Sequence, residues 1–310
     1  MLDILEKPMT ANLTAELVAR VSSETLVRRD EPMAKHTTLR VGGPADVYVE
    51  PATEADLAAV LKYCGQLRAK FFVVGRGSNL LVRDAGFRGV VICLAQPTFS
   101  RIEITGEKMF CGAGARLKQV AVEARRNGLS GLEFLEGIPG SVGGALRMNA
   151  GAMTNATFDV VQLVRVMDFA GEVRELTPDR MMVEYRSCDT LKTHVALAAV
   201  LRGQPDSVES IAQRMSAYSQ KRWASQPAAP SAGCAFKNPP MMPAGRLIDE
   251  LGLKGTRVGG AVVSQEHGNF IINDQQATAQ DVLDLIALLK AKVKAASGID
   301  LHTEVEIIGG

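Results

Sequence analysis

The hydrophobic positions of residues 31–98 alternate between strand and helix patterns. Short apolar runs at 47–49, 71–74 and 90–94 predict strands, and Pro51 ends the first. Between the first two runs, a Thr53 cap precedes one helical face made of Leu57, Val60, Leu61, Cys64 and Leu67. This order predicts a strand–helix–strand unit with a glycine turn directly after residue 74. Residues 1–30 predict an amphipathic helical lead-in.

Residues 99–205 predict a second unit that is richer in strands. Apolar runs at 102–104, 109–111 and 195–201 predict strands, and 163–168 with 173–176 predict a hairpin around Gly171. A helix carries its apolar residues on one face and ends at Gly128; these residues are Leu117, Val120, Ala121 and Ala124.

The chain changes character from about residue 206. A helix beginning at Val208 leads into a proline-rich, basic segment, and Thr278 and Asp281 begin a second helix that ends at Gly298. The last residues predict a strand with Leu301, Thr303, Val305 and Ile307 on one face and His302, Glu304, Glu306 and Ile308 on the other. The patterns divide the chain into four segments, 1–30, 31–98, 99–205 and 206–310.

Composition and charge narrow the function classes. The chain has 310 residues, enough for more than one core, and its net charge of +1 gives no global field that attracts nucleic acid or a membrane surface. Five scattered cysteines without a C-x-x-C pair argue against a zinc site or a disulfide framework. The N-terminus lacks the apolar stretch of a secretory signal, and no run approaches the ~18 apolar residues of a membrane span. We therefore expect a cytoplasmic protein.

A first glycine loop directly follows the strand at 71–74. It consists of Gly75, Arg76, Gly77, Ser78, Asn79 and Leu80. Glycines let consecutive backbone N–H groups point at phosphate oxygens, although a single loop of this kind also serves as a simple turn. Leu80 stands where a dinucleotide fingerprint has its third glycine, and the sequence has no Walker A motif. The loop therefore offers no convincing Rossmann fingerprint, and a P-loop ATPase is excluded.

A second glycine loop is longer. It contains Gly137, Ile138, Pro139, Gly140, Gly143 and Gly144 and continues to Asn149, Ala150 and Gly151. Two long glycine loops beside strands predict a large, rigid ligand that the backbone approaches closely. A dinucleotide with a flat ring system meets that demand.

Seven motifs occur in the order of one known family: HTTLRVGGPAD, VGRGSNLLV, GIPGSVGGALRMNAGA, YRSC, AGCAFKNP, AGRLIDELGLKGTRVGGAVVS and EVEIIG. From about His36 to Gly309 the chain resembles the UDP-N-acetylenolpyruvoylglucosamine reductases, also called UDP-N-acetylmuramate dehydrogenases. Each motif is modest alone, but the ordered set is specific. The short spacing between GGALRMNAGA and YRSC resembles the type II form, which lacks a tyrosine-bearing loop over the substrate.

The resemblance implies a fold and a reaction. The fold is an FAD-binding domain of the vanillyl-alcohol-oxidase-like (PCMH-type) class in two α+β subdomains, 31–98 and 99–205, with a C-terminal α+β substrate-binding domain at 206–310. The reaction is the NADPH-dependent, FAD-mediated reduction of UDP-N-acetylglucosamine enolpyruvate to UDP-N-acetylmuramate in peptidoglycan synthesis. FAD is expected to be non-covalent, because GRGSNLL lacks a linking histidine. We expect a monomer or a weak oligomer.

The resemblance also implies catalytic roles. Arg186 matches the family arginine that steadies the negative charge developing on the substrate, and Glu304 matches the glutamate near the C-terminus. Cys234 stands where the family usually has serine as proton donor, and a thiol with a reference pKa of about 8.5 is able to donate a proton. Without the family, the three would be interpreted as a surface arginine, a solvated glutamate and a small buried thiol.

For the substrate, Tyr185, Arg222, Asn238 and His267 match the family's UDP-sugar positions. Further basic residues surround these positions in sequence: Lys237, Arg246, Lys254 and Arg257. A diphosphate needs such local positive charge when the net charge is near zero. Each of these residues also fits the alternative interpretation of a solvated surface charge. For Lys254 and Arg257 the two interpretations have equal weight.

Two other functions stay open. One is a different flavin oxidoreductase of the class, although the longer cap domain and the loop histidine that would mark it are missing. The other is a catalytically altered protein that only binds FAD or a UDP-sugar. The cysteine at 234 favours it, whereas Arg186 and Glu304 argue against it.

Overall fold

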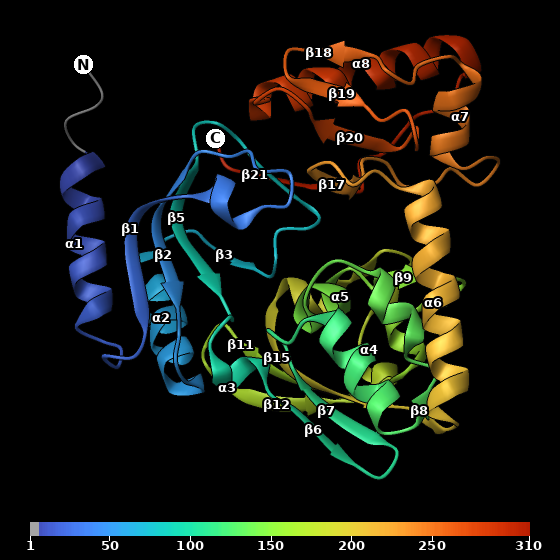
Figure 1. The fold of residues 1–310 in the computed structure, drawn as a ribbon. Helices are drawn as coiled ribbons and strands as arrows, with labels where there is room; N and C mark the ends of the chain where they lie inside the picture. Colours follow the sequence, from blue (N-terminus) through green and yellow to red (C-terminus); the bar gives the residue numbers. More distant parts are fainter. Residues whose placement is uncertain (1–5) are drawn as a thin grey trace. The chain divides into compact units, whose positions relative to one another are not determined.

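The computed structural model describes residues 6–310. They form two compact units (Figure 1). Unit 1 comprises the residues up to Asp30 together with Asp46–Gly75 and Gly89–Gln220, and unit 2 comprises Glu31–Ala45, Arg76–Arg88 and Lys221–Gly310. Residues 31–45 and 76–88 thus pack with the C-terminal residues, whereas the sequence grouped them with residues 46–75. The four predicted segments remain a prediction.

A four-stranded sheet forms the N-terminal part. Its order is β1 (Leu26–Pro32), β2 (Pro44–Glu50), β5 (Phe87–Cys93) and β3 (Phe71–Val74), and β3 runs parallel to β5. Helix α1 (Glu6–Val18) precedes the sheet, and α2 (Glu54–Leu67) packs on it (Figure 1). The Thr53 side chain accepts from Asp56 N and the Asp56 carboxylate accepts from Thr53 N, so the predicted cap is a complete capping box.

The second part of unit 1 is a five-stranded antiparallel sheet. Its order is β12 (Val173–Leu176), β11 (Val161–Asp168), β15 (His194–Arg202), β7 (Lys108–Gly112) and β6 (Ile102–Thr105). Helices α4 (Leu117–Arg126) and α5 (Val142–Arg147) lie on this sheet, and α3 (Pro97–Ser100) leads into it (Figure 1). Short elements complete the unit: β8 (Leu129–Ser130), β9 (Gly151–Ala152), β10 (Asn155–Ala156), β13 (Val183–Glu184), β14 (Ser187–Cys188) and β16 (Gln204–Pro205).

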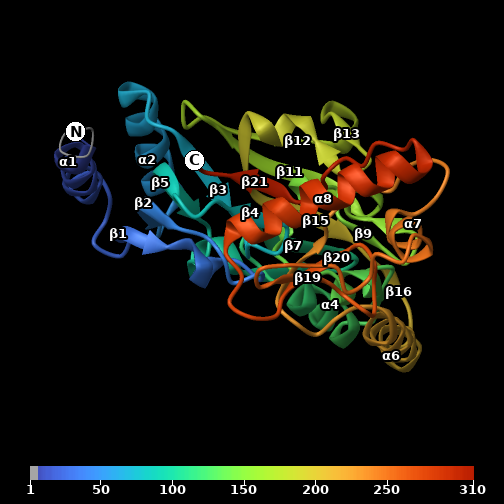
Figure 2. The same cartoon turned by 90° about the horizontal axis from the view of Figure 1, so that it is seen from above.

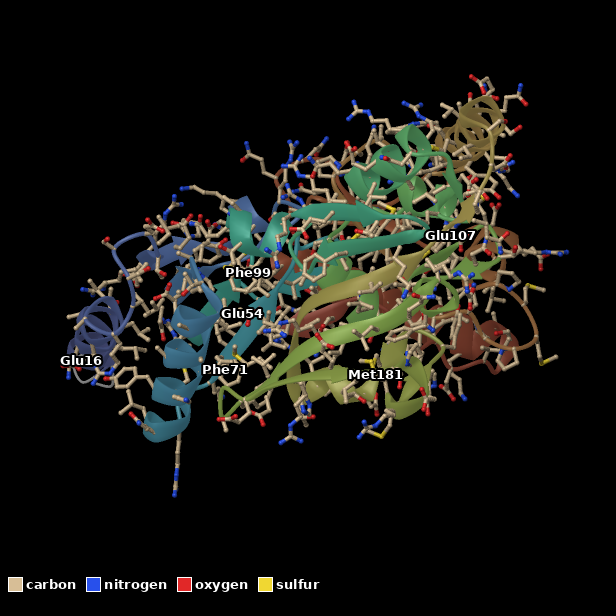
Figure 3. All side chains as sticks on the ribbon, turned by 90° about the horizontal axis from the view of Figure 1, so that it is seen from below. Glu16, Glu54, Phe71, Phe99, Glu107 and Met181 are labelled. Carbon is tan, nitrogen blue, oxygen red and sulfur yellow. The ribbon has the colours of Figure 1, made fainter. Side chains whose placement is uncertain are left out.

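Two contacts join the parts of unit 1. The Arg165 guanidinium on β11 donates to both carboxylate oxygens of Glu54 on α2, at 3.1 and 2.9 Å. The Phe71 ring on β3 meets Phe169 edge-on, with centroids 4.8 Å apart. Figure 3 labels Glu54 and Phe71, the two residues through which α2 and β3 make these contacts. One hydrophobic core, containing Val90, Phe99 and Leu146 among others, runs through both sheets, which explains why they form one unit.

Unit 2 is built on a second antiparallel sheet, ordered β17 (Ser231–Cys234), β20 (Phe270–Asn273), β19 (Ala261–Val263) and β18 (Arg257–Val258). Helix α8 (Ala279–Ser297) lies beside β18 and β19 (Figure 1), and Figure 2 shows α8 from above. It buries Val282, Leu285, Ile286, Leu289 and Val293 as predicted. Asp84 reinforces the start of α8 by accepting from Ala279 N and Gln280 N, both at 2.9 Å. Unit 2 also contains helix α7 (Ala244–Glu250) and the parallel strand pair of β4 (Leu80–Val82) with β21 (Glu306–Ile308).

Three sequence expectations need correction. The predicted lead-in helix ends at Val18 and is followed by strand β1, because tertiary pairing with β2 overrides local propensity; its residues 1–5 lie outside the described residues. Leu67 was placed on the buried face of α2 but is 52% exposed. The C-terminal strand covers only Glu306–Ile308, because residues 301–305 have no continuous strand partner and make a single bridge at Thr303.

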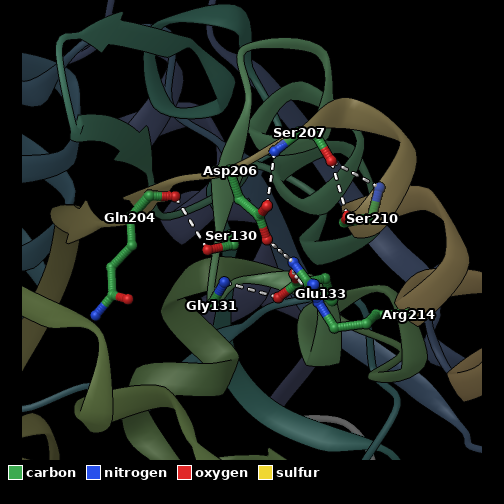
Figure 4. Close-up of polar contacts among 8 residues, drawn as sticks. All are labelled: Ser130, Gly131, Glu133, Gln204, Asp206, Ser207, Ser210 and Arg214. Atoms are coloured by element: carbon green, nitrogen blue, oxygen red, sulfur yellow. Dashed lines mark hydrogen bonds and ion pairs between the residues drawn. The ribbon is translucent and has the colours of Figure 1, made fainter.

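An ion-pair network anchors helix α6 (Val208–Ser225), which contributes residues to both units (Figure 4). Arg214 donates to Glu133 at 2.9 Å and to Asp206 at 2.6 Å, and Glu133 also accepts from Gly131 N at 2.7 Å. The pKa of Asp206 is lowered by the Arg214 hydrogen bond. Glu133 is buried and is the first residue of the short 3-10 helix η2 (Glu133–Gly137), which leads into the second glycine loop.

Removing Arg214 should therefore destabilise the protein. Arg214→Met leaves the buried Glu133 carboxylate without its cation, so we expect a loss of about 2 kcal/mol in the free energy of unfolding, less than for a fully buried pair. Urea unfolding followed by circular dichroism measures it. Arg202→Met removes an exposed pair with Glu107 and should cost less than about 0.5 kcal/mol. Equal losses for the two variants would contradict the importance assigned to Glu133.

Candidate functional site

The structure brings the two glycine loops into contact within unit 1. A methyl group added to Gly75, at the end of β3, would lie 2.7 Å from Ser141 Oγ and 3.9 Å from the backbone of Gly144. Two backbone hydrogen bonds anchor the second loop to the segment before α4. Val142 N donates to Ala115 O at 3.0 Å, and Gly143 N donates to Ala113 O at 2.8 Å. The sequence predicted both loops but not that they meet.

The loops in unit 1 offer space for a flat ligand. A methyl group at Gly137 would have no described heavy atom within 4 Å, and one at Gly144 would meet only Ser141 Oγ, at 3.8 Å. Gly140 adopts a φ of 148°, which favours glycine. Ile138 donates its N–H to Leu135 O at 3.2 Å, and Pro139 is exposed. Since open space lies where side chains at Gly137 and Gly144 would stand, these residues fit an FAD that the main chain approaches closely.

The rest of the first loop belongs to unit 2. Arg76 is exposed and Leu80 is buried as the first residue of β4. Gly77 is locked in place because Thr38 N donates to its carbonyl at 3.1 Å, and the Thr38 hydroxyl donates to Ser231 O on β17 at 2.6 Å. The HTTLR segment therefore fixes the first loop against β17, a role that the sequence did not reveal.

Gly77 provides a test of whether the first glycine loop holds the expected FAD. Its φ is 62°, and a methyl group there would lie 2.0 Å from His36 O, so Gly77→Ala must displace the loop. We expect purified Gly77→Ala to carry less than about a tenth of the wild-type flavin, because a loop displaced by an ångström loses its contacts. The ratio of absorbance at flavin and protein wavelengths measures this.

Gly106 supplies the matched control. It has a similar φ of 58° in the β6–β7 turn, but a methyl group there meets no described heavy atom within 4 Å. Gly106→Ala therefore carries the same left-handed strain without the collision. It should retain full flavin; if it loses flavin as Gly77→Ala does, the collision at residue 77 is not the cause.

The end of the second loop lies beside Arg186 in unit 1. Asn149 has a φ of 39°, and its amide donates to Glu184 O at 3.2 Å. Ala150 O accepts from Thr157 N and Thr157 Oγ1, at 2.9 and 2.7 Å. A methyl group on Gly151 would lie 3.3 Å from Arg186 Nη1. The absence of a side chain at residue 151 thus lets the guanidinium lie against the loop backbone.

Arg186 itself lies in the tight turn between β13 and β14, with a φ of 58°. Its guanidinium carbon lies 5.0 Å from the centre of the Tyr185 ring, and Tyr185 is 56% exposed. The Asn149–Glu184 bond holds this hairpin on the second glycine loop. A non-glycine residue in a left-handed conformation is uncommon and is often found at functional sites.

The segment directly after Cys234 is hydrogen-bonded to Glu304 in unit 2. Cys234 is half-buried at the end of β17, where a register shift between Ser231 and Cys234 bends the strand and Gly233 has a φ of 73°. Glu304 is also half-buried, and its N–H donates to Ala235 O at 2.9 Å. Asn79 of the first glycine loop donates to Glu304 O at 3.0 Å. A methyl group at Gly233 would lie 3.8 Å from Ser78 O, so the loop borders the cysteine strand.

Three predicted substrate residues lie in unit 2. Arg222 is in the last turn of α6, with its guanidinium carbon 5.8 Å from the centre of the exposed Trp223 ring. Asn238 accepts from Ala244 N at 3.0 Å and so orders the segment before α7. His267 accepts from Asn269 N through Nδ1 at 3.1 Å. Burial, and then the charge of Lys254, lower the pKa of His267, so the ring is neutral near pH 7 and Nε2 carries the proton.

Comparison with known proteins decides the family. The model of the FAD binding domain matches residues 45–177, and that of the UDP-N-acetylenolpyruvoylglucosamine reductase C-terminal domain matches residues 226–308. The UDP-N-acetylenolpyruvoylglucosamine reductase of Geobacter metallireducens is 45% identical over 97% of this chain and 99% of the relative. That of Bacillus subtilis is 43% identical over 92% and 94%. The chain belongs to the UDP-N-acetylenolpyruvoylglucosamine reductase family.

The solved UDP-N-acetylenolpyruvylglucosamine reductase of Thermus caldophilus agrees. It superposes with a TM-score of 0.81 at 39% identity, covering 92% of this chain and all of that one. The predicted family and α+β fold class are confirmed, and this member of the reductase family is an FAD-dependent oxidoreductase. Within residues 6–310, no helix has the length and apolar character that crossing a bilayer requires. In the same range no cluster of histidine, cysteine and carboxylate side chains is able to hold a metal ion.

Three of the basic residues that surround the expected substrate positions in the sequence are ion-paired. Arg246 contacts Glu250 at 2.7 Å, Lys254 contacts Asp249 at 2.6 Å, and Arg257 contacts Asp274. Each of these carboxylates offsets the positive charge of its basic partner. The three basic residues therefore add less positive potential than three unpaired cations would. Arg246, Lys254 and Arg257 therefore fit the interpretation as surface charges better than a diphosphate site.

Two residues that the sequence patterns do not reveal organise this candidate site. Thr38 joins the first glycine loop to β17, and Asn269 is a buried residue that bonds the segment after Cys234. In the sequence, the HTTLR motif stands out only as part of the family resemblance. Asn269 follows His267 by two positions and belongs to no recognisable motif. Both act through long-range backbone contacts, which a local sequence pattern does not reveal.

Proposed function

We propose that this protein reduces UDP-N-acetylglucosamine enolpyruvate to UDP-N-acetylmuramate with NADPH, in peptidoglycan precursor synthesis. One observation carries the proposal: hydrogen bonds in unit 2 bring the segment after Cys234, Glu304 and the flavin-loop residue Asn79 together. A proton donor, a carboxylate and part of a cofactor loop thereby meet at one place, as a reduction with proton addition requires.

The glycine loops are proposed to hold FAD non-covalently. When bound, FAD supplies the hydride that NADPH has given up. The residues proposed to contact it are Gly75, Arg76, Gly77, Ser78, Asn79, Leu80, Gly137, Ile138, Pro139, Gly140, Gly143, Gly144, Asn149, Ala150 and Gly151. Support comes from the lack of side-chain bulk at the contact of Gly75 with Ser141 and Gly144. The loops exclude water and present backbone dipoles to the pyrophosphate.

Three side chains are proposed to act on the substrate. Addition of hydride to the β-carbon leaves negative charge on the α-carbon and its carboxylate. Arg186 is proposed to stabilise this charge, because a guanidinium binds a carboxylate in two-pronged fashion. Cys234 is proposed to give its thiol proton to the α-carbon, which completes the saturated bond and leaves a thiolate that regains a proton from water. Glu304 is proposed to orient the proton path beside Cys234.

Substrate binding is proposed for Tyr185, Arg222, Asn238 and His267. The neutral His267 ring keeps Nδ1 bonded to Asn269 and leaves Nε2–H as a donor for a phosphate or carbonyl oxygen. Arg222 supplies positive charge at the end of α6. We also propose a cytoplasmic location, a monomer or weak oligomer, and no nucleic-acid or membrane partner. The four-segment division, with subdomains at 31–98 and 99–205, is proposed in the same way.

Flavin absorbance tests the function directly. NADPH added to the yellow holoprotein should bleach it, and UDP-N-acetylglucosamine enolpyruvate added afterwards should restore the colour with formation of UDP-N-acetylmuramate. Bleaching without recovery would point to a protein that binds FAD or UDP-sugar but has lost the reduction. A protein that takes up no FAD would end the proposal.

A further inference from the structure

Asn269 is a buried polar residue, 2% exposed, outside the set of proposed site residues. Its side chain bonds both backbone groups of Phe236: Oδ1 accepts from Phe236 N at 2.9 Å and Nδ2 donates to Phe236 O at 2.8 Å. We propose that Asn269 is a positioning residue for Cys234, fixing the segment that directly follows it. The inference rests on the proposed role of Cys234 as proton donor.

The strand geometry explains why a clamp is needed. The ladder between β17 and β20 ends at the pair of Cys234 with Phe270, after an irregular register from Ser231. A side-chain amide carries one donor and one acceptor in the same plane as a peptide group, so Asn269 continues the ladder beyond the end of the strand. Ala235 N also donates to Asn269 O at 2.7 Å, which makes three bonds from Asn269 to residues 235 and 236.

The clamped segment also carries Glu304 on its other side. Glu304 N donates to Ala235 O at 2.9 Å, and Lys237 N donates to His302 O at 2.8 Å. Asn269 N in turn donates to His267 Nδ1. One residue therefore sets the backbone beside the proton donor, its partner carboxylate and a substrate histidine. Since misplacement by about 1 Å costs on the order of 10²-fold in rate, loss of the clamp should be visible in catalysis.

Asn269→Asp is the most specific substitution, because it keeps the size and shape of the side chain and removes only the Nδ2 donor to Phe236 O. An acidic oxygen then faces Phe236 O, and repulsion moves the segment. In the holoprotein, bleaching by NADPH should stay within about twofold of wild type, since it does not use Cys234. Recovery with UDP-N-acetylglucosamine enolpyruvate should slow by about 10- to 100-fold.

Asn273→Asp is the matched control. Asn273 is the last residue of β20, the strand that begins directly after Asn269, and it donates to Leu39 O at 3.1 Å and accepts from Ala277 N at 2.8 Å instead of bonding residue 236. It should leave both half-reactions within about twofold of wild type. Equal slowing of recovery in the two variants would overturn the inference, because the effect would then be a general response to a charge in or directly before β20.

A double substitution separates positioning from stability. If Asn269 acts through Cys234, then Asn269→Asp should slow recovery no further once Cys234 is alanine. A full additional loss in that background would overturn the inference. Asn269→Ser serves as a second variant, since it removes the clamp without adding charge. If neither variant folds, Asn269 is a structural residue and the positioning role is wrong.

Alkylation keeps this test independent of the proposed function. The rate at which iodoacetamide modifies Cys234, followed by mass spectrometry of its peptide, should change at least about threefold in Asn269→Asp and stay unchanged in Asn273→Asp. An unchanged rate in Asn269→Asp would refute the clamp even in an active enzyme. If wild-type flavin fails to recover but the alkylation rates differ as stated, the proposed function fails and the clamp stands.

Discussion

Cys234→Ala should slow the reduction of UDP-N-acetylglucosamine enolpyruvate by about 10²- to 10⁴-fold, the contribution of a general acid. The methyl group of alanine fits the half-buried position at the end of β17 but has no proton to give. Bleaching by NADPH should not change, because Cys234 takes no part in it. Stopped-flow absorbance of the flavin resolves the two half-reactions.

Two further variants define what the thiol supplies. Cys234→Ser should keep activity, because a hydroxyl is also a proton donor, although its smaller size and weaker acidity make some loss of rate expected. Ser231→Ala, at the other end of β17, tests whether a neighbouring hydroxyl serves instead and should behave as wild type. If Cys234→Ala is as active as wild type, the proton-donor assignment is wrong.

Arg186→Ala should lower kcat for the same substrate by about 10²- to 10³-fold, the cost of removing one stabilising group from a developing charge. The backbone strain at residue 186 is similar for arginine and alanine, so the comparison reports the guanidinium. Arg186→Lys should recover only part of the rate, since an ammonium does not form the planar two-pronged contact. Steady-state kinetics with KM and kcat determined separately measures this.

Arg180→Ala is the matched control for charge. Arg180 is exposed at the end of the short turn η4 (Pro178–Arg180), before the Arg186 hairpin. The variant changes the net charge equally and should leave kcat unchanged. A similar loss in both variants would mean that Arg186 acts through the general field of the protein rather than at the substrate.

Local patterns predicted most of the fold. The strands at 71–74, 102–105 and 108–112, the hairpin of 161–168 with 173–176, and the capped helices 54–67 and 279–297 all follow from apolar periodicity and turn residues. The predictions failed where non-local pairing decides, as at residues 26–32, which form a strand only because β2 lies beside them. A partner strand that lies outside the local window, as β2 does for residues 26–32, leaves no trace in that window.

The sequence alone determined the family, the two glycine loops and the chemical character of Arg186, Cys234 and Glu304, because motif order and residue type are properties of the chain itself. Only the tertiary structure decided what these groups touch. It places Gly75 against Ser141, Gly151 against Arg186, and Cys234 in a segment held by Asn269 and Glu304. The reason is that backbone hydrogen bonds and close contacts depend on distances in space, and residues such as Thr38 and Ser231 become neighbours only once the chain has folded.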